Sequence, residues 1–427
     1  MTQADDDSNS SIPISALIIS ISNAVDAVNP LLSDHHKRVA YIVLRLCDQM
    51  KISGKERSNL VIAALLHDLG AFNHHDRIVF LEDESSDISH HAEMSYFLIK
   101  AFKPFSEVAQ IVRLHHSHWK RDRDAESGEL LAPEACHILH LADRIAGQIR
   151  PDEQILKQVN RIRQTILAQS GEMFNPDHVK HFVALSKLEY FWLDLVSGSV
   201  DSILMEEVEF ELIAMDDDVL LEVSNMFRKV VDYRSSFTAT HSAGVAYSAE
   251  ALSRYQGFSE GDARRMRVAG YLHDLGKLSI PVEILEKERR LEATEYTLMR
   301  THPYVTHHIL RPMSAFKEIR EWASFHHERL DGAGYPFHLK KEQLSLGSRI
   351  LAVADVFVAL AENRPYRGGL TREQALPILR QMSDSGALDR EIVESIDKYF
   401  DEINATRIRE QEAARTEFRG MMESRVQ

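Results

Sequence analysis

The sequence predicts an all-helical protein made of two tandem domains that arose by internal duplication. Three observations lead to this fold class. The segments AALLHDLGAF at 63–72 and AGYLHDLGKL at 269–278 repeat one motif with few changes. Histidines and aspartates recur in the same order in both halves. Apolar residues recur at three- and four-residue spacing, which is typical of helices, and alternating strand patterns are nearly absent.

Length and composition fit two folded domains. The chain has 427 residues, of which 44% are hydrophobic and 27% charged, and one domain usually spans about 100–200 residues. The net charge of −15 argues against a nucleic-acid polymer or an anionic membrane as partner, because both require a basic surface. The two cysteines, Cys47 and Cys136, match no disulfide or metal-binding pattern, which indicates inert core residues in a reducing compartment.

The first expected element is an amphipathic helix within residues 12–28. This apolar segment follows three aspartates, where a signal peptide would carry basic residues, and Ser22, Asn23 and Asp26 interrupt it. The segment therefore fits neither a signal peptide nor a membrane span. We expect the protein to be cytoplasmic.

The duplication can be followed position by position. The corresponding pairs are His35 and His241, His67 and His273, Asp68 and Asp274, His91 and His302, His115 and His326, His116 and His327, and Asp143 and Asp355. The offset between partners is 206 residues for the first three pairs, 211 for the next three and 212 for the last. Such small changes in offset make a chance match a poor explanation. We place the two domains at 1–205 and 206–427.

Apolar spacing predicts further helices around the repeated motif. Residues 58–70 and 263–277 read as helices that end at a glycine, which is a common helix C-terminal signal. Residues 202–234 read either as one long connecting helix or as two short ones, and periodicity does not decide between them.

The seven ionisable residues of the second copy predict a metal site. Burying histidine or aspartate is costly unless the side chain is paired or binds a metal, and helical bundles build metal sites from inward-facing side chains of several helices. Seven ligands exceed the need of one ion, so a pair of divalent cations is the better count. Imidazole and carboxylate without thiolate suit iron, manganese, nickel or zinc. The predicted ligands are His241, His273, Asp274, His302, His326, His327 and Asp355.

Two neighbouring cations would activate a water for phosphoester hydrolysis. Lys277 follows His273 by four residues, so we expect both side chains on one helix face, with the ammonium group able to hold a phosphate oxygen. Its counterpart in the first copy is Ala71, which cannot do so. The isolated histidines are interpreted as ordinary core or surface residues; they are His74, His75, His118, His307, His308 and His338.

The second copy resembles the HD-GYP family, a branch of the HD phosphohydrolase superfamily. The resemblance covers about residues 230–400 and rests on HDLGK at 273–277, THP at 301–303, FHHERLDGAGYP at 325–336 and RILAVADVFVALAENRPYR at 349–367. The first copy resembles the wider HD superfamily only. The resemblance implies a phosphodiesterase that converts cyclic di-GMP or 3′,3′-cyclic GMP-AMP to the linear dinucleotide, with iron or manganese as the favoured metals.

The resemblance also implies a role for each matching residue. One metal would be held by His241, His273 and Asp355, the other by His302, His326 and His327, with Asp274 bridging them and Lys277, Tyr335, Arg364 and Arg367 contacting the substrate. Asp274 and Lys277 would be the catalytic residues. Two positions depart from the family pattern. Phe237 stands where members with a third metal carry glutamate, so two metals are expected, and Val358 replaces an aspartate that supports the site.

The first copy is a candidate second metal site because it keeps all seven ligand types. These residues are His35, His67, Asp68, His91, His115, His116 and Asp143. It lacks the lysine, the GYP loop and the arginine pair. It reads as a structural duplicate, a regulatory domain or a second phosphohydrolase, and we favour a regulatory or structural role.

Two alternatives to the leading function stay open. The generic HD ligands also allow another nucleotide phosphohydrolase, and a catalytically silent cyclic-dinucleotide receptor would need no turnover. Besides the cyclic dinucleotide, the expected partner is a second copy of the chain or a signalling protein.

Overall fold

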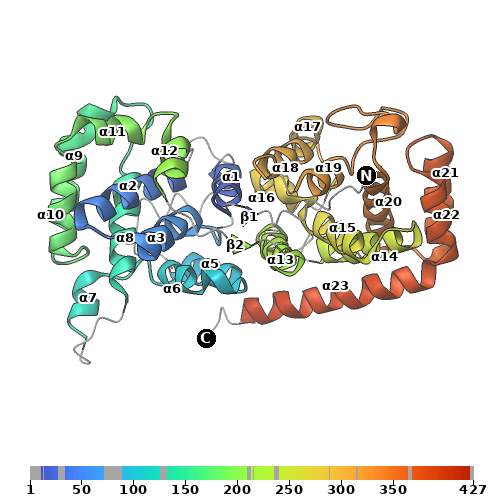
Figure 1. Cartoon of the computed structure of the whole chain (residues 1–427), viewed down its shortest axis with the longest axis horizontal. Coiled ribbons are helices and arrows are strands. Elements are labelled where there is room, and N and C mark those ends of the chain that lie inside the picture. The colour runs from blue at the N-terminus through green and yellow to red at the C-terminus, as the bar shows by residue number, and fades with distance from the viewer. Residues whose placement is uncertain are drawn as a thin grey trace, which may run out of the picture. The chain divides into compact units, whose positions relative to one another are not determined.

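The computed structural model of the chain describes residues 11–12, 14–26, 34–71, 89–125, 132–208, 213–214, 216–234, 240–287, 289–313, 316–363 and 368–423. The chain divides into two compact units, one formed by residues 13–211 and the other by residues 212–427 together with the first twelve (Figure 1). This division lies a few residues beyond the predicted position at 205/206. It also assigns the start of the chain to the C-terminal unit.

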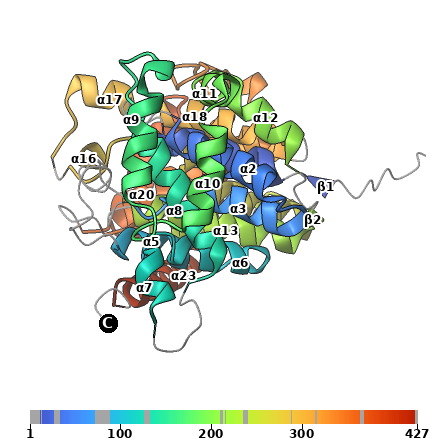
Figure 2. The same cartoon turned by 90° about the vertical axis from the view of Figure 1, so that its left-hand side faces the viewer.

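The N-terminal unit is built around three helices in mutual contact, α2, α3 and α8. On one side of this unit, α9 and α10 run next to each other (Figure 2). Its elements are α1 (Ile14–Asp26), α2 (His35–Met50), α3 (Gly54–Leu66), α5 (Ser89–Ile99), the 3-10 helix η2 (Lys103–Phe105), α6 (Ser106–Arg113), α7 (Trp119–Arg123), α8 (Glu134–Gly147), α9 (Ile155–Ala168), α10 (Pro176–Leu185), α11 (Glu189–Leu195) and α12 (Val200–Glu207).

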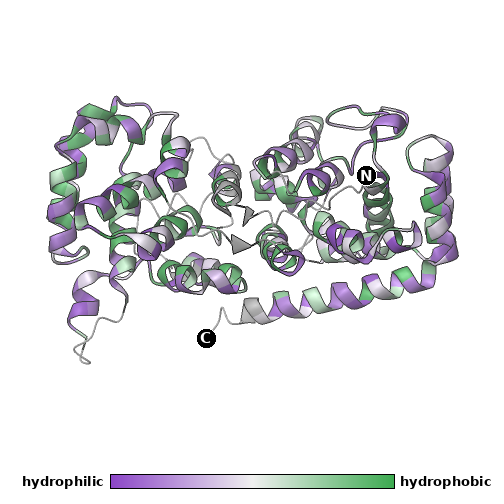
Figure 3. Cartoon of the chain, in the orientation of Figure 1, coloured by the Kyte–Doolittle hydropathy of each residue, from purple (hydrophilic) through white to green (hydrophobic). Residues whose placement is uncertain are grey.

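The C-terminal unit is centred on α14, which contacts α15, α20 and α23. Figure 3 shows α20 as mainly hydrophobic, whereas α23 alternates between hydrophobic and hydrophilic residues. The elements are β1 (Ser11–Ile12), β2 (Ile213–Ala214), α13 (Asp217–Tyr233), α14 (His241–Tyr255), α15 (Glu260–Leu272), η3 (Leu275–Ser279), α16 (Val282–Leu285), α17 (Ala293–Met299), α18 (His302–Leu310), α19 (Lys317–Ser324), η5 (Lys341–Gln343), α20 (Leu346–Ala361), α21 (Arg372–Asp384), α22 (Arg390–Lys398) and α23 (Phe400–Glu423).

The all-helical fold class is confirmed, since within the described residues the strands consist of one antiparallel pair of two residues each, with Ser11 opposite Ala214. The expected first helix is present as α1. The segment 202–234 forms two helices, α12 and α13, with β2 between them. A new helix begins at Asp217 because the Asp216 carboxylate accepts hydrogen bonds from the backbone N–H groups of Asp218 and Val219 and so caps α13.

The expectation that the two motif helices end at a glycine was wrong. α3 ends at Leu66 and α15 at Leu272, directly before the His-Asp pair, and in the second copy η3 follows. The physical reason lies at Gly276, whose backbone N–H donates to Thr306 Oγ1 at 2.9 Å instead of continuing the helix. The first copy has the same arrangement, because Gly70 N–H donates to Ser95 Oγ at 2.9 Å.

The two cysteines lie in the core, as expected. Cys47 and Cys136 are fully buried and unpaired, and burial raises the pKa of each thiol to about 12, so both are inert core residues. None of the helices in the described part of the chain combines the length and the hydropathy needed to cross a membrane.

Candidate metal centre

The centre of the C-terminal unit is the His273–Asp274 pair at the end of α15. Both side chains are almost completely buried. His273 keeps a helical conformation, whereas Asp274 leaves it with φ −94° and ψ 7°. This change of direction between neighbours points the two side chains into the unit from different angles.

Four further segments bring the other predicted ligands to the same place. His241 is the first residue of α14, and His302 is the first residue of α18. His326 and His327 form the turn after α19, and Asp355 lies within α20. The core therefore receives one side chain or a pair from each helix, as expected for a metal site in a helical bundle.

Six of these side chains form two groups. Within each group, the possible ligand atoms lie within 4.8 Å of one another. The groups are His241, His273 and Asp355, and His302, His326 and His327. Asp274 lies between them, with Oδ2 at 3.2 Å from His273 Nε2 and Oδ1 at 3.4 Å from His302 Nε2. One carboxylate thus offers an oxygen atom to each group.

Backbone hydrogen bonds fix the orientation of three of the imidazoles. The Nδ1–H groups of His273, His302 and His326 donate to backbone carbonyl oxygens three residues earlier, at 2.7, 2.8 and 2.7 Å. A neutral imidazole that donates through Nδ1 carries its lone pair on Nε2. All three Nε2 atoms are therefore available as metal ligands.

The histidine-rich group fits a cation. The Nε2 atoms of His302 and His326 lie 3.3 Å apart, and with both protons on Nδ1 neither atom can donate to the other. Burial lowers the pKa of His302 to about 3 and that of His326 to about 4, so both rings are neutral at pH 7. Two lone pairs that face each other repel unless a cation lies between them, and this observation supports a metal there.

The aspartates are held in the ionised form that metal binding requires. Burial opposes ionisation of Asp274, but the His273 ring and the Lys277 ammonium group hold its pKa well below the usual range.

His241 differs from His302 and His326 in its protonation. Burial opposes the charge on His241, yet the carboxylates of Glu362 and Asp355 raise the pKa of this ring to about 10. Binding of a cation at His241 Nε2 would consequently release a proton.

Lys277 reaches the site by a different route from the predicted one. It lies in η3 and not on the helix face of His273, because α15 has already ended. Its Nζ atom lies 2.6 Å from Asp274 Oδ2, three residues earlier. The buried Arg234 guanidinium donates to the carbonyl oxygens of Lys277, Leu278 and Ile280 and so holds this turn in place.

Tyr335 lies beside one of the predicted ligands, His327. Its ring centroid is 4.8 Å from that of His327, and the Arg300 guanidinium carbon lies 4.8 Å from the Tyr335 ring centroid. The loop is fixed by the buried Glu328, whose carboxylate accepts from the backbone N–H groups of Phe337 and Leu339 at 2.7 and 2.9 Å. Arg364, Arg367 and Phe237 lie outside the described residues.

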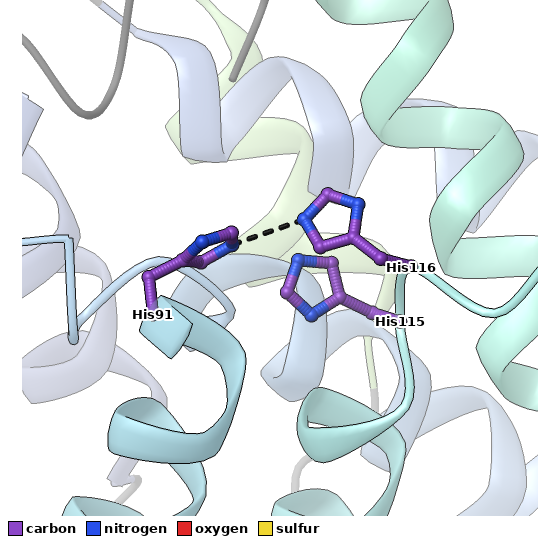
Figure 4. A group of neighbouring side chains, drawn as sticks. All are labelled: His91, His115 and His116. Atoms are coloured by element: carbon purple, nitrogen blue, oxygen red, sulfur yellow. Dashed lines mark hydrogen bonds between the residues drawn. The ribbon is translucent and has the colours of Figure 1, made fainter. Parts of the chain in front are cut away.

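The first copy brings its own predicted ligands together in the same way. Its groups are His35, His67 and Asp143; His91, His115 and His116; and His67, Asp68 and His115. Figure 4 shows the imidazoles of His91, His115 and His116 converging, with 3.0 Å between Nε2 of His91 and Nε2 of His116. The first two of these groups thus correspond to the two groups of the second copy.

Buried nitrogens in the first copy also fit a cation. His67 and His115 donate through Nδ1 to backbone carbonyls at 2.8 and 2.6 Å. Their buried Nε2 atoms have no hydrogen-bond partner among the described residues. Ala71, at the lysine position, is buried and offers no charge. This copy therefore groups the candidate ligands but has no lysine at the position that corresponds to Lys277.

Four of the six histidines that were interpreted as ordinary core or surface residues lie among the described residues. His118, His308 and His338 are exposed and His307 is half-buried, while His74 and His75 lie outside the described residues.

Sequence reasoning missed two residues near the site, Glu362 and Arg300. Glu362 follows Asp355 by seven residues, a spacing that returns to the same helix face and could have indicated it. Arg300 stands two residues before His302 with no distinctive spacing, so only the structure finds it.

Comparison with known proteins follows the same division of the chain. A family model described as HD domain matches residues 32–148, and a second HD-domain model matches residues 225–392. The chain is similar to two proteins of Vibrio cholerae named 3′3′-cGAMP-specific phosphodiesterase 1 and 3. The first is 28% identical over 88% of this chain and 89% of the relative, and the second is 27% identical over 86% and 91%.

A solved structure shares the fold. It is a crystal structure of a cyclic GMP-AMP-specific phosphodiesterase of V. cholerae, with a TM-score of 0.61 and 24% identity over 93% of this chain and 97% of the other.

Proposed function

Since this chain belongs to the HD family, with an HD domain in each half, we propose that its C-terminal unit is a metal-dependent phosphodiesterase that hydrolyses a cyclic dinucleotide to the linear dinucleotide. The observation that carries the proposal is the position of Asp274. Its two oxygens face one imidazole of each ligand group, at 3.2 and 3.4 Å, and the Lys277 ammonium group lies beside it.

In the proposed mechanism, two divalent cations would supply an activated water and neutralise charge on the phosphate oxygens. His241, His273 and Asp355 would hold one cation and His302, His326 and His327 the other, with Asp274 contributing to both. Lys277 would hold a nonbridging oxygen of the scissile phosphate, because its ammonium group is the cation nearest to the shared carboxylate. Iron or manganese is favoured, since the donor set has no thiolate.

The substrate proposal rests on the relatives and on the rim of the site. The two V. cholerae relatives are named for 3′3′-cGAMP, which supports this nucleotide ahead of cyclic di-GMP. Tyr335 offers an aromatic face to a base. Arg300, whose guanidinium stacks on that ring, adds a positive charge for a phosphate. These local cations suit an anionic substrate of a protein whose net charge is −15.

The N-terminal unit is proposed to bind metal without hydrolysing cyclic dinucleotides. It has matching ligand groups, but Ala71 replaces the lysine. A regulatory or structural role follows for the domain that the sequence places at 1–205, and the catalytic role falls to the domain at 206–427.

Product analysis tests the function. The purified chain, loaded with iron or manganese, is incubated with 3′3′-cGAMP, cyclic di-GMP and a panel of mononucleotides, and the products are separated by chromatography. We expect linear dinucleotide, with 3′3′-cGAMP preferred. The double variant His273→Ala with Asp274→Ala should lose about 1,000-fold or more in rate, because it removes groups that act as a unit.

The duplication provides a matched control. The equivalent double variant of the first copy, His67→Ala with Asp68→Ala, should keep most of the activity. Turnover of mononucleotides alone would favour another nucleotide phosphohydrolase. Tight binding of cyclic dinucleotide without any product would indicate a silent receptor. Either result would overturn the proposal.

A further inference from the structure

The ring of His241 has a carboxylate at each nitrogen. Nε2 lies 3.1 Å from Asp355 Oδ1. Nδ1 lies 3.1 Å from both Oε1 and Oε2 of Glu362. All three residues are at least nine-tenths buried. Since Asp355 belongs to the ligand group, Glu362 occupies the opposite edge of the imidazole.

Glu362 stands where α20 ends. It is the C-cap residue of α20, with extended backbone angles of φ −83° and ψ 152°. Val358, one turn earlier, is fully buried and apolar and can support no ligand through a hydrogen bond. Glu362, at the end of the same helix, places a carboxylate beside His241, whereas Val358 has none.

A buried polar chain from α23 holds Glu362 in turn. Gln411 Nε2 donates to Glu362 Oε2 at 3.1 Å, and the Arg407 guanidinium donates to Gln411 Oε1. Arg407 also donates to Asn404 Oδ1 from Nε and Nη2, at 2.9 and 2.8 Å. Gln411 and Arg407 are 5% and 6% exposed. Such a satisfied buried network limits the conformations open to each member.

The backbone of α14 is shaped for this contact. Gln411 packs against Gly244, three residues after His241, and a Cβ atom at Gly244 would lie only 2.7 Å from Gln411 Nε2. Further along α23, Glu417 accepts from Arg228 and Lys229 of α13, at 3.2 and 2.5 Å. The helix that carries Gln411 is thus also attached to α13 by these ion pairs.

From these contacts we propose that Glu362 is a positioning residue for His241 and that α23, through Gln411, fixes Glu362 for this task. The Glu362 carboxylate accepts the Nδ1 proton of His241 and so directs the Nε2 lone pair towards the ligand group. Carboxylate partners of metal-binding histidines fix the tautomer and strengthen the ligand. This inference rests on the proposed function, because it assumes that His241 binds a metal.

The test measures metal retention and does not depend on turnover. Wild-type chain and the variants Glu362→Gln and Glu362→Ala are loaded with manganese, dialysed against graded chelator and assayed for bound metal by elemental analysis. We expect both variants to lose one of the two C-terminal cations at about 10- to 100-fold lower chelator concentration. To count the C-terminal cations alone, every protein, the reference with Glu362 included, also carries His67→Ala and Asp68→Ala together with His115→Ala and His116→Ala, so that both ligand groups of the first copy are disrupted.

Three variants separate positioning from a general loss of stability. Glu362→Asp should recover part of the lost affinity, because it restores the charge. Gln411→Ala should show the same defect more weakly. Glu250→Gln is the matched control, since Glu250 is also a glutamate of this unit with 5% exposure but pairs with Arg254. It should retain both cations.

Several outcomes would overturn the inference. Retention of both cations by Glu362→Gln at the wild-type chelator concentration would do so, even if the phosphodiesterase activity were established. An equal loss in Glu250→Gln would reduce the effect to stability. A wild-type count of three cations that falls to two in Glu362→Gln would make Glu362 a ligand. A wild-type chain that binds two cations but turns over no nucleotide would refute the proposed function and leave this inference standing.

Discussion

At the scale of single residues, the chemistry of the site depends on which nitrogen of each imidazole carries the proton. In both copies a backbone carbonyl three residues earlier fixes the proton on Nδ1. It accepts a hydrogen bond from Nδ1 of each of these rings: His67, His115, His273, His302 and His326. His241 differs, since a carboxylate takes the place of the carbonyl. The helical turn itself thus prepares most of the ligands before a metal binds.

Lys277 gives the first test at this scale. Replacement by glutamine removes the ammonium group but keeps a chain of similar length, so we expect kcat/KM for the cyclic dinucleotide to fall about 100-fold or more. Metal content should not change, because Lys277 is not a ligand. Elemental analysis and initial rates on the same sample check both statements.

The first copy contains a control for this variant. Lys37 pairs with Asp34 at 2.7 Å across three residues and is 14% exposed, much as Lys277 pairs with Asp274 at 2.6 Å and is 17% exposed. Lys37→Gln should leave the rate unchanged. A comparable loss in both variants would mean that removal of an ion pair, and not of a substrate contact, explains the effect.

The pKa shifts of the histidines predict how the metal-free protein responds to acid. Burial lowers the pKa of His302 from the ordinary value of 6.5 to about 3 and that of His326 to about 4. Below pH 6.5 the unfolded chain binds protons on these rings that the folded chain does not bind. The free energy of unfolding should therefore fall as the pH drops from 6.5 towards 4.

Melting temperatures of chelator-treated protein at pH 7 and pH 5 measure this dependence. The value at pH 5 should be lower, and the double variant His302→Gln with His326→Gln should show a smaller difference between the two pH values. Equal or higher stability at pH 5 would contradict the burial of neutral imidazoles.

How much could be read from the sequence differs from residue to residue. The candidate ligands and their pairing between the copies could be selected from the sequence, because the duplication preserved order and offset, and the structure groups these side chains. That Lys277 lies in η3 and not in α15 could not be predicted from the sequence. It depends on where α15 ends, and the Gly276 N–H there bonds to Thr306, which is distant in the sequence. The contact from Gln411 to Glu362 was equally hidden, because it joins residues 49 positions apart.

At the scale of elements, the glycine of the repeated motif allows two segments to approach. A Cβ atom at Gly276 would lie 1.9 Å from the His302 carbonyl oxygen, and one at Gly70 would lie 2.5 Å from that of His91. In both copies the glycine lets the helix that begins the second ligand group pack directly on the His-Asp turn. Sequence analysis interpreted this glycine as the end of the helix, which was wrong because α15 and α3 end earlier, at Leu272 and Leu66. The close contact with the neighbouring backbone is what requires a glycine here.

Gly276→Ala tests this packing. The added methyl group overlaps the backbone of α18, so we expect destabilisation of about 1–3 kcal/mol or more, together with weaker metal binding. Gly261→Ala serves as the control, because a Cβ there meets only Ser259 Oγ at 3.8 Å. Chemical denaturation of both variants gives the comparison, and similar stabilities would rule out the proposed role of close approach.

At the scale of the whole molecule, the duplicated units keep the same ligand plan, but the first copy lacks the lysine, the GYP loop and the arginine pair of the second. Each unit has its own buried core and its own ligand clusters. The sequence predicted this plan because every ligand type occurs twice. It could not show whether the first copy had kept the geometry, since that depends on packing around His91, His115 and His116.

Separate metal sites in the two units lead to a further prediction. His67→Ala with Asp68→Ala should lower the metal content of the chain without changing the metals of the C-terminal unit, and His273→Ala with Asp274→Ala should do the converse. Elemental analysis of both double variants and of their combination measures this. A single double variant that empties the whole chain would show that the sites depend on each other.

The position of α23 has a practical consequence for anyone who trims or fuses this protein. The HD-domain match ends at residue 392, whereas the amide that steadies Glu362 comes from residue 411. A fragment cut at the end of the match would retain every predicted ligand and substrate contact. It would lose the hydrogen bond from Gln411 to Glu362, the carboxylate partner of His241. A tag or reporter protein fused directly after residue 423 would adjoin α23, the helix that we propose fixes Glu362.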